Sequence, residues 1–205
     1  MSAMLAKRVL PFVVFLVITV LAVAYFMSRG FSARDEPTAV EAYVARQLRH
    51  MSVPLSARGM ANPVPSNPEA LSEAMEHFAD HCAFCHANNG SGNTAIGKGL
   101  YPKAPNMKEA STQNLSDGEL YYIIHNGVRF TGMPAFGKED GQQDLDSWKL
   151  VRFIRHLPQI TDEELAHMKE MNPKTPGDLK EEEDINRFLE GGEPEPSEAT
   201  HQHHH

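Results

Sequence analysis

The stretch of sequence that decides the fold is Cys82-Ala-Phe-Cys85-His86, near the middle of a chain of 205 residues. It contains the only two cysteines of the sequence. Two cysteines are too few for a scaffold held by several disulfides. They are also too few for a zinc or iron–sulfur site built on four thiolates. The pair therefore forms one disulfide, has no chemical role, or does chemistry that needs only two thiols.

The spacing C-x-x-C-H is the attachment pattern of c-type haem. Two thiols at this spacing can add across the two vinyl groups at one edge of the porphyrin, and the next histidine can bind the iron. A thioredoxin-like redox pair is an alternative, but it is expected in a βαβ context, and the surrounding sequence is helical. A lone disulfide would leave His86 unexplained. The motif predicts one covalent haem c on Cys82 and Cys85, with His86 as the proximal iron ligand.

A haem that transfers electrons usually needs a second axial ligand, and Met133 is the strongest candidate. It lies in Thr131-Gly-Met-Pro-Ala-Phe-Gly137, where glycines and a proline indicate a loop. Such a loop could bring the thioether to the iron from the face opposite His86. Met107, in another loop, is the second candidate. His125 as a second histidine ligand and an open sixth site are further alternatives, because most of the ten methionines are expected to fill gaps in apolar surfaces.

Capping signals and helical periodicity predict the surroundings of the motif. A capping box at Ser66-Asn-Pro-Glu69 should begin a helix that runs to Cys82. A second capping box, Ser116-Asp-Gly-Glu119, should begin a middle helix. A strongly apolar helix then ends at Pro158 and contains the single tryptophan, Trp148, which we expect to pack rather than to catalyse.

Together, residues 68–158 resemble a class I c-type cytochrome. The resemblance covers somewhat under half of the chain and implies an all-α fold, a small helical haem domain in which the first and last helices cross. Small and aromatic residues meet at that crossing in the family. The matching residues here are Ala74 and Phe78 on the first helix, and Leu150 and Phe153 on the last.

The resemblance also concerns the surroundings of the haem. The family often uses a proline carbonyl to orient the proximal imidazole through its Nδ1–H. Pro102 and Pro105 are both candidates for that role. An apolar pocket would favour the reduced iron, because the oxidised site carries more charge. We expect that pocket to be lined by Phe84, Tyr101, Phe130, Phe136 and Trp148.

Residues 1–30 carry a membrane signal. Lys7 and Arg8 precede an uncharged stretch of 19 residues over 9–27. As a helix this stretch would be about 28 Å long, close to the hydrocarbon thickness of a bilayer. A cleaved secretory signal is the alternative, because Ala22-Val-Ala24 fits a cleavage site. Aromatic residues at the far edge favour a retained transmembrane anchor. Both interpretations place the rest of the chain outside the cytoplasm.

Residues 31–67 are expected to form a stalk and a linker. A capping box at Thr38-Ala-Val-Glu41 precedes a short amphipathic helix. Apolar residues recur in it at helical spacing, at Val40, Tyr43, Val44, Leu48 and Met51. The prolines and the glycine between residues 54 and 68 then indicate a semi-rigid spacer. Residues 28–67 would thus act as a swinging arm.

The net charge of −8 is unevenly distributed. Residues 1–67 carry +4, residues 68–158 carry −3 and residues 159–205 carry −9. An acidic balance excludes nucleic acid as the main partner, because binding phosphates needs a basic face. The acidic extension, 159–205, could instead dock a basic protein.

The same extension is predicted to contain two short helices followed by a disordered end. Thr161-Asp-Glu-Glu164 should cap the first helix, and residues 180–190 should form the second, packed on the haem domain or on a partner subunit. Residues 193–198 are expected to be disordered. The last histidines could bind Cu²⁺, Zn²⁺ or Ni²⁺. They are His201, His203, His204 and His205.

These features predict an electron-transfer protein rather than an enzyme. It would carry one electron on a His86/Met133 haem at the periplasmic side of a bacterial cytoplasmic membrane, held by a single membrane-spanning helix. Its partners would be a redox donor and acceptor in or near the membrane, such as components of a respiratory chain, and it could be a subunit of a larger complex. Two alternatives are a haem enzyme or gas sensor with an open sixth site, and a metal-binding accessory subunit that uses the histidine-rich end.

Overall fold

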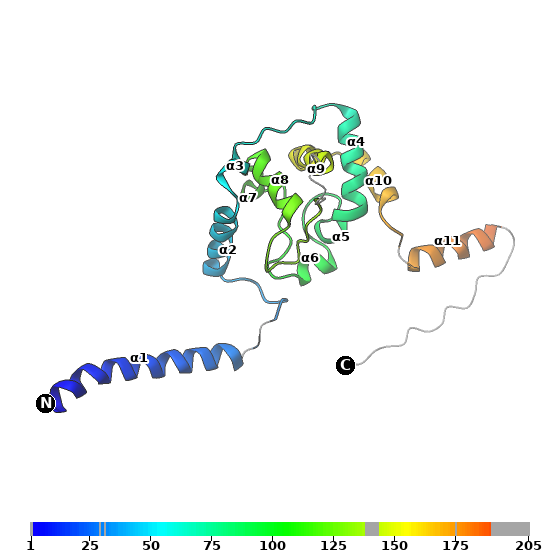
Figure 1. The fold of residues 1–205 in the computed structure, drawn as a ribbon. Helices are drawn as coiled ribbons and strands as arrows, with labels where there is room; N and C mark the ends of the chain where they lie inside the picture. Colours follow the sequence, from blue (N-terminus) through cyan, green and yellow to red (C-terminus); the bar gives the residue numbers. More distant parts are fainter. Residues whose placement is uncertain (1, 29, 31, 138–143, 175, 190–205) are drawn as a thin grey trace.

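The computed structural model of the chain describes residues 2–28, 30, 32–137, 144–174 and 176–189. Every regular element in these residues is helical, which confirms the all-α class (Figure 1). Longer helices are α1 (Ser2–Ser28), α2 (Ala39–Ser52), α4 (Pro68–His77), α8 (Asp117–Asn126), α9 (Leu145–His156), α10 (Asp162–Met171) and α11 (Pro176–Leu189). Short ones are α3 (Leu55–Arg58), η1 (Phe78–Cys82), α5 (Ala83–His86), α6 (Ala95–Gly99), α7 (Ala110–Gln113) and η2 (Leu157–Gln159).

Most helices begin where the capping signals predict. Complete capping boxes start α2 at Thr38, α8 at Ser116 and α10 at Thr161. The N-cap of α4 lies one residue later than predicted, because the side chain of Asn67, not that of Ser66, accepts the hydrogen bond from the Ala70 amide. The physical reason is the proline at position 68, which disfavours helical backbone in the residue before it and fits the first helical position.

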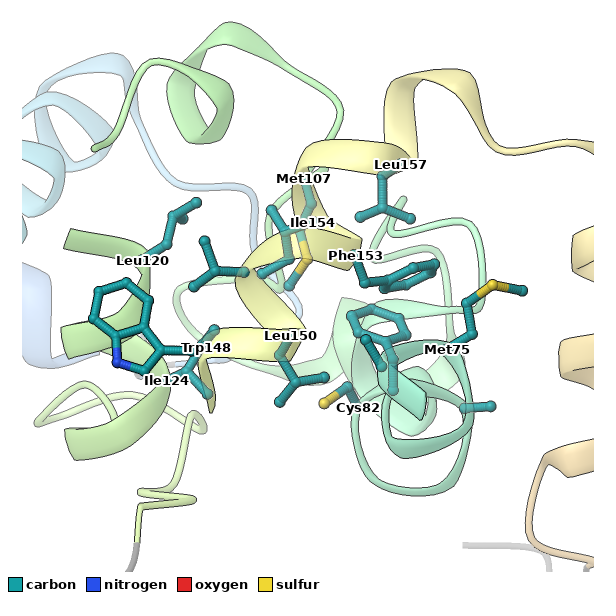
Figure 2. Packing of buried hydrophobic residues seen from close by; sticks show 14 of the residues in the cluster. Met75, Cys82, Met107, Leu120, Ile124, Trp148, Leu150, Phe153, Ile154 and Leu157 are labelled. Carbon is teal, nitrogen blue, oxygen red and sulfur yellow. The ribbon is translucent and has the colours of Figure 1, made fainter. Parts of the chain in front are cut away.

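The core of residues 68–158 is the crossing of α4 with α9. Ala74 on α4 and Val151 on α9 are fully buried, with exposed fractions of 0%. The rings of Phe78 and Phe153 pack with their centroids 4.7 Å apart and their planes at 57°. Figure 2 shows Leu150 and Phe153 of α9 on the side of the cluster that holds Cys82. The predicted contact between the first and last helices is therefore present.

The middle helix α8 packs on the other side of α9. Trp148 is 1% exposed and stacks on Tyr121 of α8, with centroids 4.2 Å apart. Leu120 and Ile124 of α8 lie beside it (Figure 2). Trp148 is thus a packing residue, as predicted.

Part of the predicted linker packs on the domain instead of standing free of it. Val53, Ala57 and Val64 are each at most 6% exposed. Arg152 of α9 donates from Nε to the carbonyl of Val64 at 3.0 Å. The Asn62 side chain donates to the carbonyl of Trp148 at 2.9 Å. The segment contains the short helix α3, and its valines and alanine bury enough apolar surface to attach it. These contacts contradict a swinging arm that extends over all of residues 28–67.

The first helix of the acidic extension packs back on the domain. Met168 of α10 is 0% exposed and belongs to the main hydrophobic cluster. His156 at the end of α9 and Glu164 on α10 form a hydrogen bond, with Nε2 and Oε1 2.8 Å apart. The predicted second helix is present as α11 and begins at Pro176, earlier than residue 180. Residues 193–198 lie outside the described part of the chain.

The N-terminal helix α1 is apolar on all sides. Its stretch Val9–Ser28 is long and apolar enough to cross a membrane, and none of it is buried by the protein. Phe12, Phe15 and Leu21 are each more than 60% exposed. A helix that is hydrophobic all round needs an apolar environment from outside the chain. This finding fits the predicted anchor.

Candidate haem site

The C-x-x-C-H motif directly follows α4 along the chain, on continuous helical backbone. The π-helical segment η1 ends at Cys82, and α5 carries Cys85 and His86. Both cysteines are free thiols, with Cys82 buried and Cys85 partly buried, so the structure contains no disulfide between them. Burial, with a smaller contribution from nearby Cys85, raises the pKa of Cys82 to about 12. The Cys82 thiol is therefore neutral, and the two cysteines lie three positions apart along one helical turn, which is the spacing for attachment to a porphyrin edge.

The imidazole of His86 is buried and neutral. Its residue is 8% exposed, and its Nδ1 has no hydrogen bond of standard geometry. Burial lowers the pKa of His86 to about 4, although the backbone of Pro105 acts in the opposite direction. A neutral imidazole keeps a ring-nitrogen lone pair, which is the form that binds metals. Because proline has no backbone N–H, the Pro105 group beside this ring is its carbonyl, so Pro105 fits the expected orienting role better than Pro102.

A glycine-containing loop wraps around the motif and holds its backbone. The amide of Gly92 donates to the carbonyl of His86 at 2.8 Å. The hydroxyl of Thr94 donates to the carbonyl of Cys85 at 3.2 Å and caps α6. A Cβ on Gly97 would overlap the Cys85 carbonyl and lie 2.6 Å from the Gly92 carbonyl, so only glycine allows this approach. The loop fixes the direction of α5 and hence of His86.

Met133 lies in a tight loop that is tied to the end of α8. Its carbonyl accepts from the Val128 amide at 3.0 Å, and its amide donates to the hydroxyl of Thr131 at 3.1 Å. Gly127, with φ of +65°, ends α8 so close to this loop that a Cβ there would lie 2.8 Å from the Met133 carbonyl. The Met133 side chain is partly exposed. The predicted loop is thus present, and its backbone is fixed from both sides.

The other two candidates for the second ligand already have partners in the protein. Met107 is 8% exposed and lies in the hydrophobic cluster beside Ile154 (Figure 2). His125 holds the carboxylate of Asp144, with Nδ1 and Oδ2 2.9 Å apart, and its ring stacks on Tyr121 at 5.3 Å. Both side chains are thereby accounted for by packing, which favours Met133 among the three.

The aromatic residues expected around the haem fall into two groups. Trp148 belongs to the protein core, as described above, and Phe136 packs against its edge. Phe84, Tyr101 and Phe130 are exposed, with exposed fractions of 68%, 41% and 93%. Phe84 lies between the two cysteines, so the motif itself carries an exposed apolar side chain. The donor set, the neutral imidazole and this apolar surface all fit a haem bound at Cys82 and Cys85.

Sequence reasoning missed several residues that support the site. Asp144 caps α9, accepts from Ser147 and pairs with His125, so it links the helix that carries Trp148 to the end of α8. Thr94 and Gly97 shape the loop around α5. Glycines between the motif and residue 99 were a visible signal for that loop, whereas the Asp144 network has no local signature.

The predicted second metal site at His201, His203, His204 and His205 lies outside the described residues. Among the residues that are described, no group of three or more His, Cys, Asp or Glu side chains could hold a metal ion. A haem needs no such group, because it brings its own iron and takes one ligand from the motif.

Comparison with known protein families gives a match to part of the chain. Residues 69–154 match the family model described as "Cytochrome C oxidase, cbb3-type, subunit III". The comparison with curated proteins found no match. The matched range begins within the first turn of α4 and ends within α9, so it contains the motif, its loop, α8 and the Met133 loop.

Proposed function

We propose that the chain is a one-electron carrier with a single covalent haem c, held at the outer face of the cytoplasmic membrane, because residues 69–154 match a c-type cytochrome family. Such a domain indicates electron transfer through haem. The observation that carries the proposal is the buried, neutral imidazole of His86 directly after two free thiols on one helical segment. The proposed role is that of a carrier rather than an enzyme.

Each residue of the site has a distinct task in this proposal. Cys82 and Cys85 would hold the haem by thioether bonds, and His86 and Met133 would supply the two protein ligands of its iron. When bound, the haem supplies a reversible one-electron change at its iron, and imidazole and thioether serve as ligands in both oxidation states. Burial keeps His86 unprotonated, while the Pro105 carbonyl orients it and increases its basicity.

The rigidity of the Met133 loop also supports a carrier. Hydrogen bonds from Val128 and to Thr131 fix its backbone, and Phe136 donates from its amide to the Ile124 carbonyl at 3.1 Å. A ligand on such a loop stays in place when the charge of the site changes. Little reorganisation is then needed for each electron, as transfer between proteins requires.

Membrane attachment through α1 would hold the carrier close to its partners. A tether raises the effective concentration of the domain near membrane proteins. The matched family is described as a subunit of an oxidase, so a membrane redox complex is the partner class that we propose for this chain. The acidic extension offers a surface for a basic partner.

The Met133 assignment is tested by near-infrared spectroscopy of the oxidised, full-length protein. A thioether on ferric haem gives a weak charge-transfer band in that region, and we expect the band to vanish in Met133→Ala. Met107→Leu is the matched control, because it removes the other loop methionine while keeping its volume in the core. A band that survives in Met133→Ala, or that is lost in Met107→Leu, would overturn the assignment.

A further inference from the structure

Helix α2 (Ala39–Ser52) has its apolar side turned away from the protein. The apolar stripe is formed by five large side chains on one face of the helix. They are Val40 at 71% exposed, Tyr43 at 59%, Val44 at 46%, Leu48 at 60% and Met51 at 74%. At about 100° per residue they occupy an arc of roughly 140°. No residue of α2 is buried, so the described residues of the chain leave this stripe uncovered.

The opposite face of α2 is the one that contacts the domain. The partly buried residues of the helix are Ala42, Ala45 and Arg49. Arg49 lies about 180° around the helix from the middle of the stripe and donates from Nη2 to the Ser111 carbonyl at 3.4 Å. An amphipathic helix on a soluble domain normally buries its apolar stripe and exposes its polar face. Here the arrangement is reversed.

The end of α2 is also fixed to α8 through contacts with the Glu119 carboxylate. His50 Nδ1 lies 3.1 Å from Oε1 of Glu119, and Arg58 Nε lies 3.7 Å from the same oxygen. Glu119 is 6% exposed, and Arg58 donates to the carbonyl of His50. These contacts hold the helix in its reversed orientation, so the stripe cannot turn inward without breaking them.

We propose that the apolar stripe of α2 lies in the interfacial layer of the bilayer that holds α1, so that the domain rests on the membrane. The inference rests on the membrane anchoring in the proposed function. Only residues 29–38 separate the two helices, and ten extended residues span at most about 36 Å. Figure 1 shows α2 at the edge of the helical body, on the chain between α1 and α3. The stripe is therefore confined near the membrane surface.

The length and composition of α2 favour a helix lying on the bilayer over one crossing it. Its 14 residues are about 21 Å long, which is too short to span the hydrocarbon core. Arg46 and His50 flank the stripe, and Tyr43 lies within it. Aliphatic residues beside an arginine such as Arg46 and an aromatic residue such as Tyr43 are typical of helices that bind the interface. Two attachments, α1 and α2, would then fix which side of the domain faces the membrane.

Site-directed spin labelling of the haem-loaded full-length protein in nanodiscs of phosphatidylcholine and phosphatidylglycerol tests the inference. One cysteine is introduced per variant, as Leu48→Cys in the stripe, Arg46→Cys outside it, or Ile18→Cys in α1. Spectra are taken in the reduced state, in which low-spin iron is diamagnetic. Mass spectrometry should find one label per chain, because haem occupies Cys82 and Cys85; further labels would contradict the proposed haem attachment instead.

The result expected is that the Leu48 and Ile18 labels are more accessible to oxygen than to a water-soluble nickel complex, and that the Arg46 label shows the reverse. A Leu48 label as accessible to nickel as the Arg46 label, with the Ile18 label still in lipid, would overturn the α2 proposal alone. A Leu48 label shielded from both reagents would also overturn it and would indicate a protein partner or a second copy. An Ile18 label in water would contradict the anchoring.

Discussion

Replacing Gly118 by alanine tests whether residues 53–64 pack on α8. The replacement should stabilise a free helix, but it should destabilise a helix that is packed against this segment. Gly118 is buried in the first turn of α8. An added Cβ would overlap the carbonyl oxygen of Ala57 and lie 3.1 Å from Cβ of Met60. On a free helix the same change stabilises by about 1 kcal/mol, because glycine is a poor helix former. The sign of the measured effect therefore reports on the contact.

The change in the free energy of unfolding depends on which atoms must move to make room for the added Cβ. The overlap is with a backbone atom, which no side-chain rotation can relieve, so the upper part of the overpacking range applies, about 3 kcal/mol. Subtracting the helix gain leaves a net loss of about 2 kcal/mol in the free energy of unfolding. If residues 53–64 separated from the domain, Val53 and Val64 would become exposed. The hydrogen bond from Asn62 to the carbonyl of Trp148 would also break. Cleavage by a protease between residues 53 and 64 should then become faster.

Urea unfolding followed by circular dichroism measures the change, and Gly59→Ala is the matched control. Gly59 lies in the same segment with nothing within 4 Å of an added Cβ, so its replacement should be nearly neutral. If Gly118→Ala stabilises the protein by about 1 kcal/mol, as on a free helix, the packing of residues 53–64 on α8 is refuted.

Two further predictions concern the periphery of the domain. Met168→Ala should lower the free energy of unfolding by about 2–5 kcal/mol, because the Met168 side chain is 0% exposed. Met171 is only partly buried, so Met171→Ala should cost clearly less. Equal costs of the two replacements would show that α10 is not part of the core. Burial raises the pKa of Asp144, but hydrogen bonds from Ser147 and His125 outweigh it, and the net pKa lies below 3.8. The stabilisation is thus complete above about pH 4 and is lost as the pH falls through the lowered pKa. Urea titrations should find that the difference in free energy of unfolding between wild type and Asp144→Asn is largest at neutral pH and becomes smaller in acid. A difference that does not change with pH would contradict this prediction.

Much of the fold could be predicted because its signals are local. Thr38, Ser116 and Thr161 begin helices through hydrogen bonds to residues three positions on, so the sequence alone contains the information. The shift from Ser66 to Asn67 is also local, since it depends on the next residue being proline. The crossing of α4 and α9 was predicted only through the resemblance to a family.

Long-range contacts were not predictable in the same way. Nothing near residue 57 indicates that its carbonyl lies against Gly118, and nothing in the apolar stripe of α2 indicates that it points away from the domain. Periodicity shows that a helix has an apolar face but not what covers it. In the site, the spacing of Cys82, Cys85 and His86 is a local signal, whereas the choice between Met133 and Met107 depends on packing far along the chain.

The most direct test of the central claim, that the chain is an electron carrier with both axial positions of its iron filled, is carbon monoxide binding to the reduced full-length protein. The account predicts no change in the Soret band on rapid mixing with carbon monoxide at neutral pH, because His86 and Met133 hold the iron. Fast formation of a carbon monoxide complex in the reduced protein, or a high-spin five-coordinate spectrum before mixing, would contradict it and indicate an open site for catalysis or gas sensing.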